Sequence, residues 1–252
     1  MCIRDRIMAD HIKFPFLKTK ISLFDLQNLE NKGFLRSIFI ELLKADKIKN
    51  IIPNEFQINQ TKQELFLKYN FDQIKNKKDN EFLINDLNKE ICKLASLKKL
   101  SLDKFSSQAE KIFKIRKAYH YDQYFYSLLR NKNKSQIYEF YYQIESKESN
   151  INDLSKEHSS GSEKEKLGII GPVNLININS EIAEILKTSK DSTINDPIEM
   201  NNEWYLIQRE NYKPAIYSEY YENQICLELL EKEIEKEYKN EYLNLMNNKL
   251  YF

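Results

Sequence analysis

The sequence predicts an α+β fold in three parts: a helical N-terminal domain at residues 1–120, a mixed domain at 121–212 and a long helix at 213–252. Apolar residues recur at helical spacing in the first and last parts. Aromatic-rich runs typical of strands appear in the middle part. Three of the chain's four glycines also lie within eleven residues there, which indicates a loop and a tight turn between a helix and a strand.

Residues 21 to about 118 are predicted to form helices. The clearest evidence is an apolar stripe from Phe34 to Leu43, whose members recur at i, i+1, i+4, i+5, i+8 and i+9 behind the turn residue Gly33. Further helices are expected at 23–29, from Gln60 to about 69, at 82–97, and from an N-cap at Ser101 or Asp103 to 115.

The middle domain is predicted to follow the order β-α-α-β-α-β-β. Its expected elements are a strand at 124–130, a helix at 137–145 capped by Ser135, a helix at 151–158, the glycine loop and a strand, a helix at 180–186, a turn at 193–197, and a hairpin of 198–200 with 204–209. Pro214 ends this domain, and one amphipathic helix is expected from Ile216 to about Met246.

Composition excludes several functional classes. The chain has 39 basic and 38 acidic residues, a balance that argues against a strong electrostatic surface for nucleic acid. Its three cysteines are far apart and form neither a metal-binding spacing nor a disulfide framework, so no metal and no cofactor are expected. There is no phosphate-binding glycine loop followed by Lys-Ser/Thr and no nucleophile elbow.

The N-terminal sequence predicts the compartment. No stretch approaches 18 apolar residues, so no membrane span is expected, and the short apolar run near Phe14 is broken by Pro15. A cytoplasmic location is therefore predicted. Residues 1–6 join no pattern that follows and Met8 is another possible start, so a targeting signal lost from this end would change that prediction.

Several landmarks of the middle domain occur in a specific order. They are the opening strand 124–130, the helix end 153–160, the turn Leu167-Gly168-Ile169-Ile170-Gly171, the Asn195-Asp196-Pro197 turn and the closing strand 203–210. As an ordered set they resemble the parvulin-type (PpiC-like) domain of peptidyl-prolyl cis-trans isomerases, over residues 123–212. The three-part arrangement also resembles that of parvulin-containing foldases, in which the C-terminal helix packs back on the N-terminal helices.

The resemblance implies catalysis of rotation about X-Pro bonds, whose barrier is about 18–20 kcal/mol without a catalyst. The family uses a histidine pair, a Cys or Asp, and an apolar proline pocket. The polar positions are substituted here: Tyr126 or Ser127 replaces the first-strand histidine, Tyr205 the final-strand histidine, and Lys166 the Cys or Asp.

The apolar pocket positions are retained as Ile170, Leu175 and Ile182, whereas the chain's histidines lie at other positions. Two roles are open for the substituted polar positions. The hydroxyls of Tyr126, Ser127 and Tyr205 can donate to a prolyl carbonyl, or Tyr205 simply fills its strand position in the core. Lys166 is interpreted as a solvated loop charge.

Three functional hypotheses follow. The first is a parvulin-type isomerase and protein-folding factor whose partners are unfolded or extended proline-containing polypeptides. The second is a catalytically degenerate parvulin fold that serves as a non-enzymatic chaperone or adaptor. The third is an assembly protein that dimerises through its C-terminal helix, against the simpler expectation that this helix packs within the chain. The first is adopted as the prediction, and the oligomeric state is left open.

Overall fold

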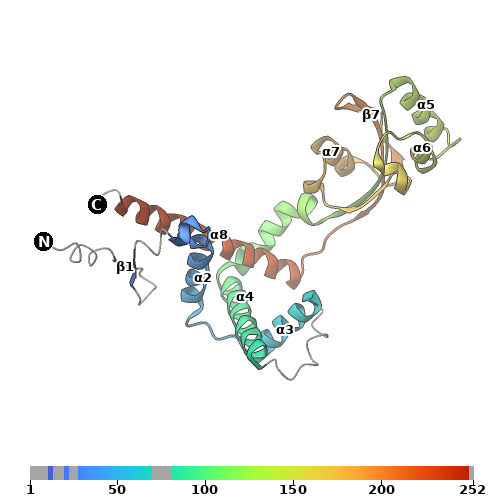
Figure 1. Cartoon of the computed structure of the whole chain (residues 1–252). Coiled ribbons are helices and arrows are strands. Elements are labelled where there is room, and N and C mark those ends of the chain that lie inside the picture. The colour runs from blue at the N-terminus through green and yellow to red at the C-terminus, as the bar shows by residue number, and fades with distance from the viewer. Residues whose placement is uncertain (1–10, 14–19, 23–27, 70–80, 250–252) are drawn as a thin grey trace. The chain divides into compact units, whose positions relative to one another are not determined.

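The computed structural model describes residues 11–13, 20–22, 28–69 and 81–249 (Figure 1). The chain divides into two compact units. The helical unit comprises Met1–Glu110 and Ser218–Phe252, and the mixed unit comprises Lys111–Tyr217. The mixed unit thus contains the whole of the predicted 121–212 domain, together with a segment on either side of it.

The helical unit contains four long helices and one short strand pair in its described residues. The strands β1 (His11–Lys13) and β2 (Lys20–Ser22) pair antiparallel. The helices are α2 (Leu35–Ile48), α3 (Glu55–Tyr69), most of α4 (Glu81–Arg116) and α8 (Glu219–Lys249). The strand pair corrects the expectation of a helix from residue 21, because Ile21 pairs with Ile12 in a register that suits β-branched residues. Residues 23–27 of the helix expected at 23–29 lie outside the described residues.

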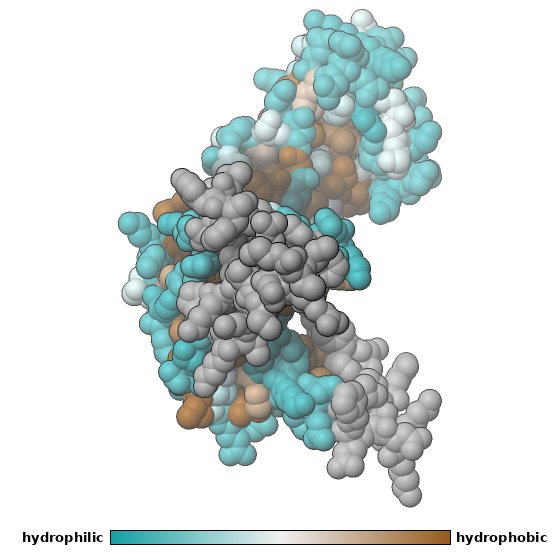
Figure 2. Space-filling view, turned by 60° about the vertical axis from the view of Figure 1, so that its left-hand side comes forward, coloured by the Kyte–Doolittle hydropathy of each residue, from teal (hydrophilic) through white to brown (hydrophobic). Residues whose placement is uncertain are grey.

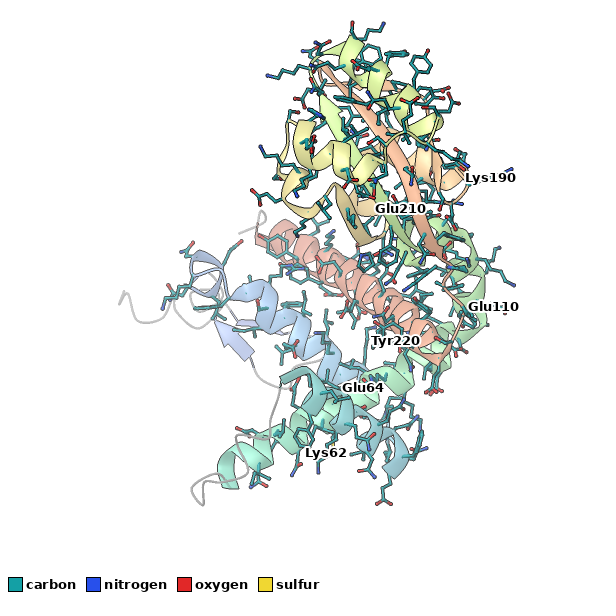
Figure 3. The ribbon with its side chains drawn as sticks, turned by 90° about the vertical axis from the view of Figure 1, so that its right-hand side faces the viewer. Lys62, Glu64, Glu110, Lys190, Glu210 and Tyr220 are labelled. Atoms are coloured by element: carbon teal, nitrogen blue, oxygen red, sulfur yellow. The ribbon has the colours of Figure 1, made fainter. Side chains whose placement is uncertain are left out.

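The core of the helical unit forms around the apolar stripe predicted on α2. Its buried members Leu35, Phe39 and Leu43 recur at i, i+4 and i+8. They pack against Leu97 of α4 and against Leu230 and Ile234 of α8. This contact confirms that the C-terminal helix packs back on the helical region. The outer faces carry mixed charges, such as Lys62 and Glu64 on α3 (Figure 3).

Two helix boundaries differ from the sequence-based prediction. Helix α4 is continuous, so Ser101 is not an N-cap: its buried hydroxyl donates to the Lys98 carbonyl at 2.8 Å within the same helix. Helix α3 starts at Glu55 instead of near residue 60. The reason is a capping box, in which the Asn54 side chain accepts from the Gln57 N–H (2.8 Å) and the Gln57 side chain accepts from the Asn54 N–H (2.9 Å).

The mixed unit is an antiparallel sheet covered by helices on both faces (Figure 1). Its strands are β3 (Gln123–Asn131), β4 (Ile169–Val173), β5 (Thr193–Ile194), β6 (Ile198–Met200) and β7 (Glu203–Lys213), in the order β4-β3-β7-β5 with β6 also paired to β7. Its helices are α5 (Lys134–Glu145), α6 (Ile151–His158) and α7 (Ser180–Thr188). The α+β class and the order of elements are confirmed.

Two details of the mixed unit correct the prediction. The turn expected at 193–197 begins with the short strand β5, in which Thr193 pairs with Arg209 of β7. The cap of α5 is Asn133 and not Ser135. The Asn133 side chain accepts from the backbone N–H groups of Ser135 (3.0 Å) and Gln136 (3.3 Å), because an Asn two residues earlier reaches these free donors.

Candidate functional site

One face of the sheet in the mixed unit carries most of the predicted site residues. Side chains alternate along a strand, so Tyr124, Tyr126 and Leu128 of β3 share a face with Tyr205 and Ile207 of β7. Helix α7 and the 3-10 turn Leu175–Asn177 (η5) pack on this face. We call it the α7 face; helices α5 and α6 cover the opposite face around Leu129 and Leu206.

Ser127 does not reach the α7 face. It is fully buried on the opposite side of β3, where its Oγ accepts a hydrogen bond from Asn152 Nδ2 of α6 at 2.8 Å. The same Asn152 donates to the Leu167 carbonyl at 2.9 Å. Ser127 therefore ties α6 and the glycine loop to the strand, and strand alternation turns its hydroxyl away from the α7 face.

Tyr126 and Tyr205 both lie on the α7 face but are not neighbours. The strand register places Tyr126 opposite Arg209 and Tyr205 opposite Arg130. Four residues of β3 separate these two positions, about 13 Å at the usual rise per residue. The structure therefore offers two separate hydroxyls where the resemblance implied a histidine pair.

The Tyr126 hydroxyl has no hydrogen-bond partner among the described residues. No buried polar atom of these residues lacks a partner, so this oxygen must reach the surface of the unit, although the residue is only 4% exposed. Burial raises the pKa of Tyr126 to about 12, and the nearby Glu163 carboxylate contributes to the rise. Tyr126 is thus a neutral donor held at the edge of an apolar cluster, beside Ile170 of β4.

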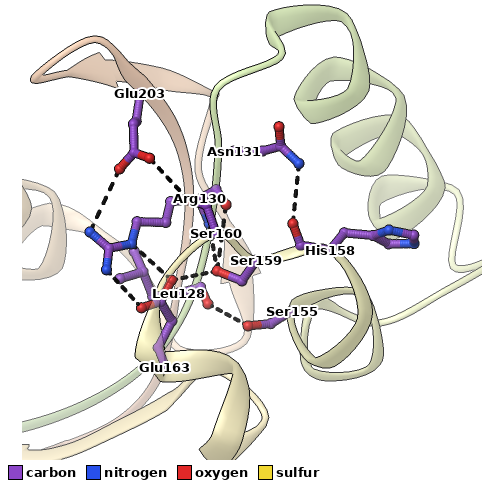
Figure 4. Close-up of polar contacts among 9 residues, drawn as sticks. All are labelled: Leu128, Arg130, Asn131, Ser155, His158, Ser159, Ser160, Glu163 and Glu203. Carbon is purple, nitrogen blue, oxygen red and sulfur yellow. Dashed lines mark hydrogen bonds and ion pairs between the residues drawn. The ribbon is translucent and has the colours of Figure 1, made fainter.

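A polar cluster surrounds Arg130 near the end of β3 (Figure 4). Arg130 donates to both carboxylate oxygens of Glu163, from Nε at 3.0 Å and from Nη2 at 3.2 Å. Its Nη1 lies 3.6 Å from Glu203, and the Ser159 hydroxyl donates to Glu163. Burial opposes the charge of Arg130, but hydrogen bonds to Glu163 and Tyr205 raise its pKa.

Glu163 is the acidic residue that the sequence analysis missed. Its side chain is 6% exposed. Burial alone would raise its pKa, but hydrogen bonds from Ser159, a backbone N–H and Arg130 outweigh this effect and hold the pKa below its usual value. Lys166, which aligns with the family's Cys or Asp, is exposed, as expected for a solvated loop charge.

The three clustered glycines allow the loop to approach β3 closely. A Cβ on Gly161 would overlap the Arg130 guanidinium and the Glu163 carboxylate. A Cβ on Gly168, whose φ is +74°, would lie 2.6 Å from the Leu128 carbonyl oxygen. Gly161, two residues before Glu163, leaves the space that the Arg130–Glu163 ion pair occupies.

The predicted apolar positions form the base of the α7 face. Leu175 and Ile182 are buried, at 2% and 7% exposure, whereas Ile170 is half-buried. Ile176 of η5 is exposed at 55%. Figure 2 shows hydrophobic surface in the middle of the mixed unit, framed by hydrophilic residues. Of the three predicted positions, only Ile170 presents much surface to a ligand. The other two belong to the buried cluster against which Ile170 packs.

The family model for the PPIC-type peptidyl-prolyl isomerase (rotamase) domain matches residues 126–211. These residues form a parvulin-type isomerase domain. The match confirms the resemblance seen in the sequence, and with it the functional class of a PPIC-type peptidyl-prolyl isomerase for this domain. No curated protein sequence matches the chain.

Several solved structures are similar to the whole chain at low identity. They are the peptidylprolyl isomerase PrsA from Bacillus anthracis (20% identity, TM-score 0.40, covering 84% of this chain and 97% of that one), PrsA from Bacillus cereus (17%, 0.41, 95% and 92%) and a SurA-like chaperone of Campylobacter jejuni (14%, 0.39, 94% and 98%). At these TM-scores they add no argument to the assignment, which rests on the domain match.

The described histidine side chains of the isomerase domain are not among the residues of the apolar cluster on the α7 face. His158 is exposed at the end of α6 and stacks on Phe140, with ring centroids 4.7 Å apart. His120 is exposed in the π-helix Lys117–Tyr121 (η3). Within the described residues, no cluster of His, Cys, Asp and Glu could hold a metal ion, and no helix is long and apolar enough to cross a membrane.

Proposed function

We propose that the isomerase domain binds extended, proline-containing segments of unfolded polypeptides on its α7 face and accelerates their cis/trans rotation. The observation that carries this proposal is the free hydroxyl of Tyr126. It lies at the edge of a buried apolar cluster and next to the half-buried Ile170. The position offers an apolar contact for the pyrrolidine ring and a donor beside it.

Two physical effects lower the barrier in this arrangement. The planar amide owes its stiffness to a charge-separated resonance form, which water stabilises and an apolar surface does not. Rotation also breaks the conjugation and leaves a lone pair on the prolyl nitrogen. A neutral tyrosine hydroxyl can donate to that lone pair, and the raised pKa of Tyr126, about 12, keeps its proton in place.

The test measures prolyl isomerisation in short X-Pro peptides by NMR exchange, which needs no coupled protease. The wild-type chain should accelerate exchange, and Tyr126→Phe should lower kcat/KM about tenfold, the effect of one hydrogen bond made in the transition state. Tyr142→Phe is the matched control. It removes the same atom from an exposed tyrosine of α5, so its kcat/KM should equal that of wild type.

Other outcomes would contradict the proposal. Wild-type chain that leaves exchange at the uncatalysed rate, yet binds unfolded protein, would support the non-enzymatic chaperone hypothesis. Equal activity in wild type and Tyr126→Phe would show that the α7 face acts without this hydroxyl.

A further inference from the structure

Two short segments connect the isomerase domain with the rest of the chain. The chain enters this unit at Lys111 and leaves it at Tyr217. We call residues 111–122 the entry segment and residues 213–217 the exit segment. The entry segment contains the end of α4 and the π-helix η3, an irregularity that is often found at functional sites.

Asp122 joins the entry segment to the exit segment. Its side chain is 2% exposed and accepts hydrogen bonds from three donors. Lys117 Nζ lies 2.9 and 3.1 Å from its two oxygens, the Tyr212 hydroxyl donates at 2.6 Å, and the backbone N–H of Ala215 donates at 2.7 Å. Both oxygens of one buried carboxylate are therefore used to hold the two segments together.

The same residue also contacts the α7 face in two ways. Tyr212, which donates to Asp122, packs its ring 5.0 Å from that of Tyr124 within the apolar cluster. The backbone carbonyl of Asp122 accepts from Asn174 Nδ2 at 2.9 Å, and Asn174 directly precedes the buried Leu175. Loss of the Asp122 contacts would thus loosen two sides of this face.

Aromatic packing provides a second link between the segments. Phe113 of the entry segment stacks on Tyr121, with centroids 5.1 Å apart and ring planes 8° apart. Tyr217 of the exit segment packs on the same Phe113 at 5.3 Å. This packing keeps the segments together when the polar link is removed, so a variant of Asp122 should change their dynamics without unfolding the domain.

We infer that Asp122 is a positioning residue that fixes one end of the α7 face to the segments through which the chain enters and leaves the isomerase domain. A displacement of either segment is then transmitted to Tyr212 and Asn174, and so to the surface where the polypeptide binds. The effect on substrate rests on the proposed function, whereas the effect on the segments does not.

Hydrogen exchange followed by mass spectrometry tests the link in the full chain. In Asp122→Asn, exchange of the exit segment should rise about tenfold, because the Ala215 N–H loses a charged acceptor. Exchange within residues 126–131 and 204–208 should not change. Tyr212→Phe removes only the hydroxyl and keeps the ring on Tyr124, so it should give a smaller rise. Asp153→Asn, at an exposed acid in the first turn of α6 that accepts from Asn150, is the control and should leave exchange of the exit segment as in wild type.

The peptide assay supplies a second readout. A positioning role predicts that Asp122→Asn raises KM several-fold and changes kcat less than twofold, while Asp153→Asn changes neither. Unchanged exchange of the exit segment in both Asp122→Asn and Tyr212→Phe would overturn the inference, as would a rise spread equally over β3 and β7. If Asp122→Asn does not fold, Tyr212→Phe decides. A wild-type chain without isomerase activity contradicts the proposed function alone, and the exchange result then decides the role of Asp122.

Discussion

The two units differ in how their buried polar side chains are satisfied. In the described part of the helical unit, each buried hydroxyl donates to a carbonyl three or four residues earlier in its own helix: Thr61 to Gln57, Ser96 to Cys92 and Ser101 to Lys98. Of these three, only Ser96 also reaches another segment, at the Ile51 carbonyl 3.3 Å away. In the isomerase domain, buried polar groups bond between elements instead. Ser155 of α6 donates to the Leu128 carbonyl of β3, and Glu163 binds Arg130.

This difference separates two ways of stabilising a fold. A hydroxyl that bonds within its own helix adds little to tertiary structure, because the helix would exist without it. A buried group that bonds between elements specifies how they meet, and it leaves an unsatisfied partner when it is removed. Polar substitutions should therefore destabilise the isomerase domain more than the helical unit. Trp204, the chain's only tryptophan, lies in β7, so its fluorescence reports on the isomerase domain.

The largest effect is expected from Glu163→Ala. Removing the carboxylate leaves Arg130 and Ser159 without their buried partner, which should cost about 3–5 kcal/mol of unfolding free energy. Urea unfolding followed by Trp204 fluorescence measures the loss. Glu165→Ala is the control, because Glu165 is exposed on the same 3-10 turn. A loss below about 1 kcal/mol would show that the ion pair does not hold the loop.

A glycine pair sharpens the comparison, because it has one member in each unit. Gly168 and Gly33 have nearly the same φ, +74° and +73°, but only Gly168 is crowded. Gly33→Ala should cost about 1–2 kcal/mol from the left-handed backbone alone. Gly168→Ala should cost about 3 kcal/mol, because the added Cβ also meets the Leu128 carbonyl. Urea unfolding measures both losses, from Trp204 fluorescence for Gly168→Ala and from helical circular dichroism for Gly33→Ala. Equal losses would show that close approach to β3 is not the reason for glycine at position 168.

The loss of stability at low pH should depend on salt differently in the two units. The pKa of Glu163 lies below its usual value of 4.5, so its contribution to stability is complete above pH 4.5 and disappears as pH falls through the lower folded value. Burial also opposes ionisation of Glu41, but hydrogen bonds from Lys44 and Lys93 lower its pKa as well. The two side chains differ in exposure, 6% for Glu163 and 47% for Glu41. Urea unfolding at several pH values should show an acid loss that 1 M salt reduces in the helical unit only, because exposed pairs are screened. Trp204 fluorescence reads the acid loss of the isomerase domain in wild type and in Glu163→Gln. The expectation would be contradicted if 1 M salt reduced this loss in wild type and to the same extent in Glu163→Gln.

The smallest effect compares two buried serines. Ser155→Ala should cost about 1 kcal/mol, because the Leu128 carbonyl loses a donor from another element. Ser101→Ala should be within about 0.5 kcal/mol of wild type, since alanine favours the helix and the Lys98 carbonyl remains in a helical segment. Urea unfolding of each unit measures both values. A larger loss for Ser101 would break the comparison.

The sequence predicted the elements of the isomerase domain more completely than its site. Helix α7 and the hairpin of β6 and β7 were expected within a few residues, because their periodicity and turn residues are local. Tyr126 and Tyr205 were correctly placed on strands, but the prediction treated them as one site. The register that separates them depends on the pairing of β3 with β7, which no local pattern specifies. The cytoplasmic location stays a prediction.

By itself the sequence determined the helical stripes, the glycine loop and the ordered landmarks of a parvulin-type domain, since each of these depends on residues that are close together in the chain. Only the tertiary structure decided that Ser127 faces α6, that Glu163 turns inward and that Asp122 joins two segments. These outcomes depend on partners far apart in sequence: 33 residues separate Arg130 from Glu163, and 90 separate Asp122 from Tyr212. A local pattern predicts that a charged or hydroxyl side chain is exposed to solvent. Such a side chain is buried only where the fold places a hydrogen-bonding or oppositely charged group beside it.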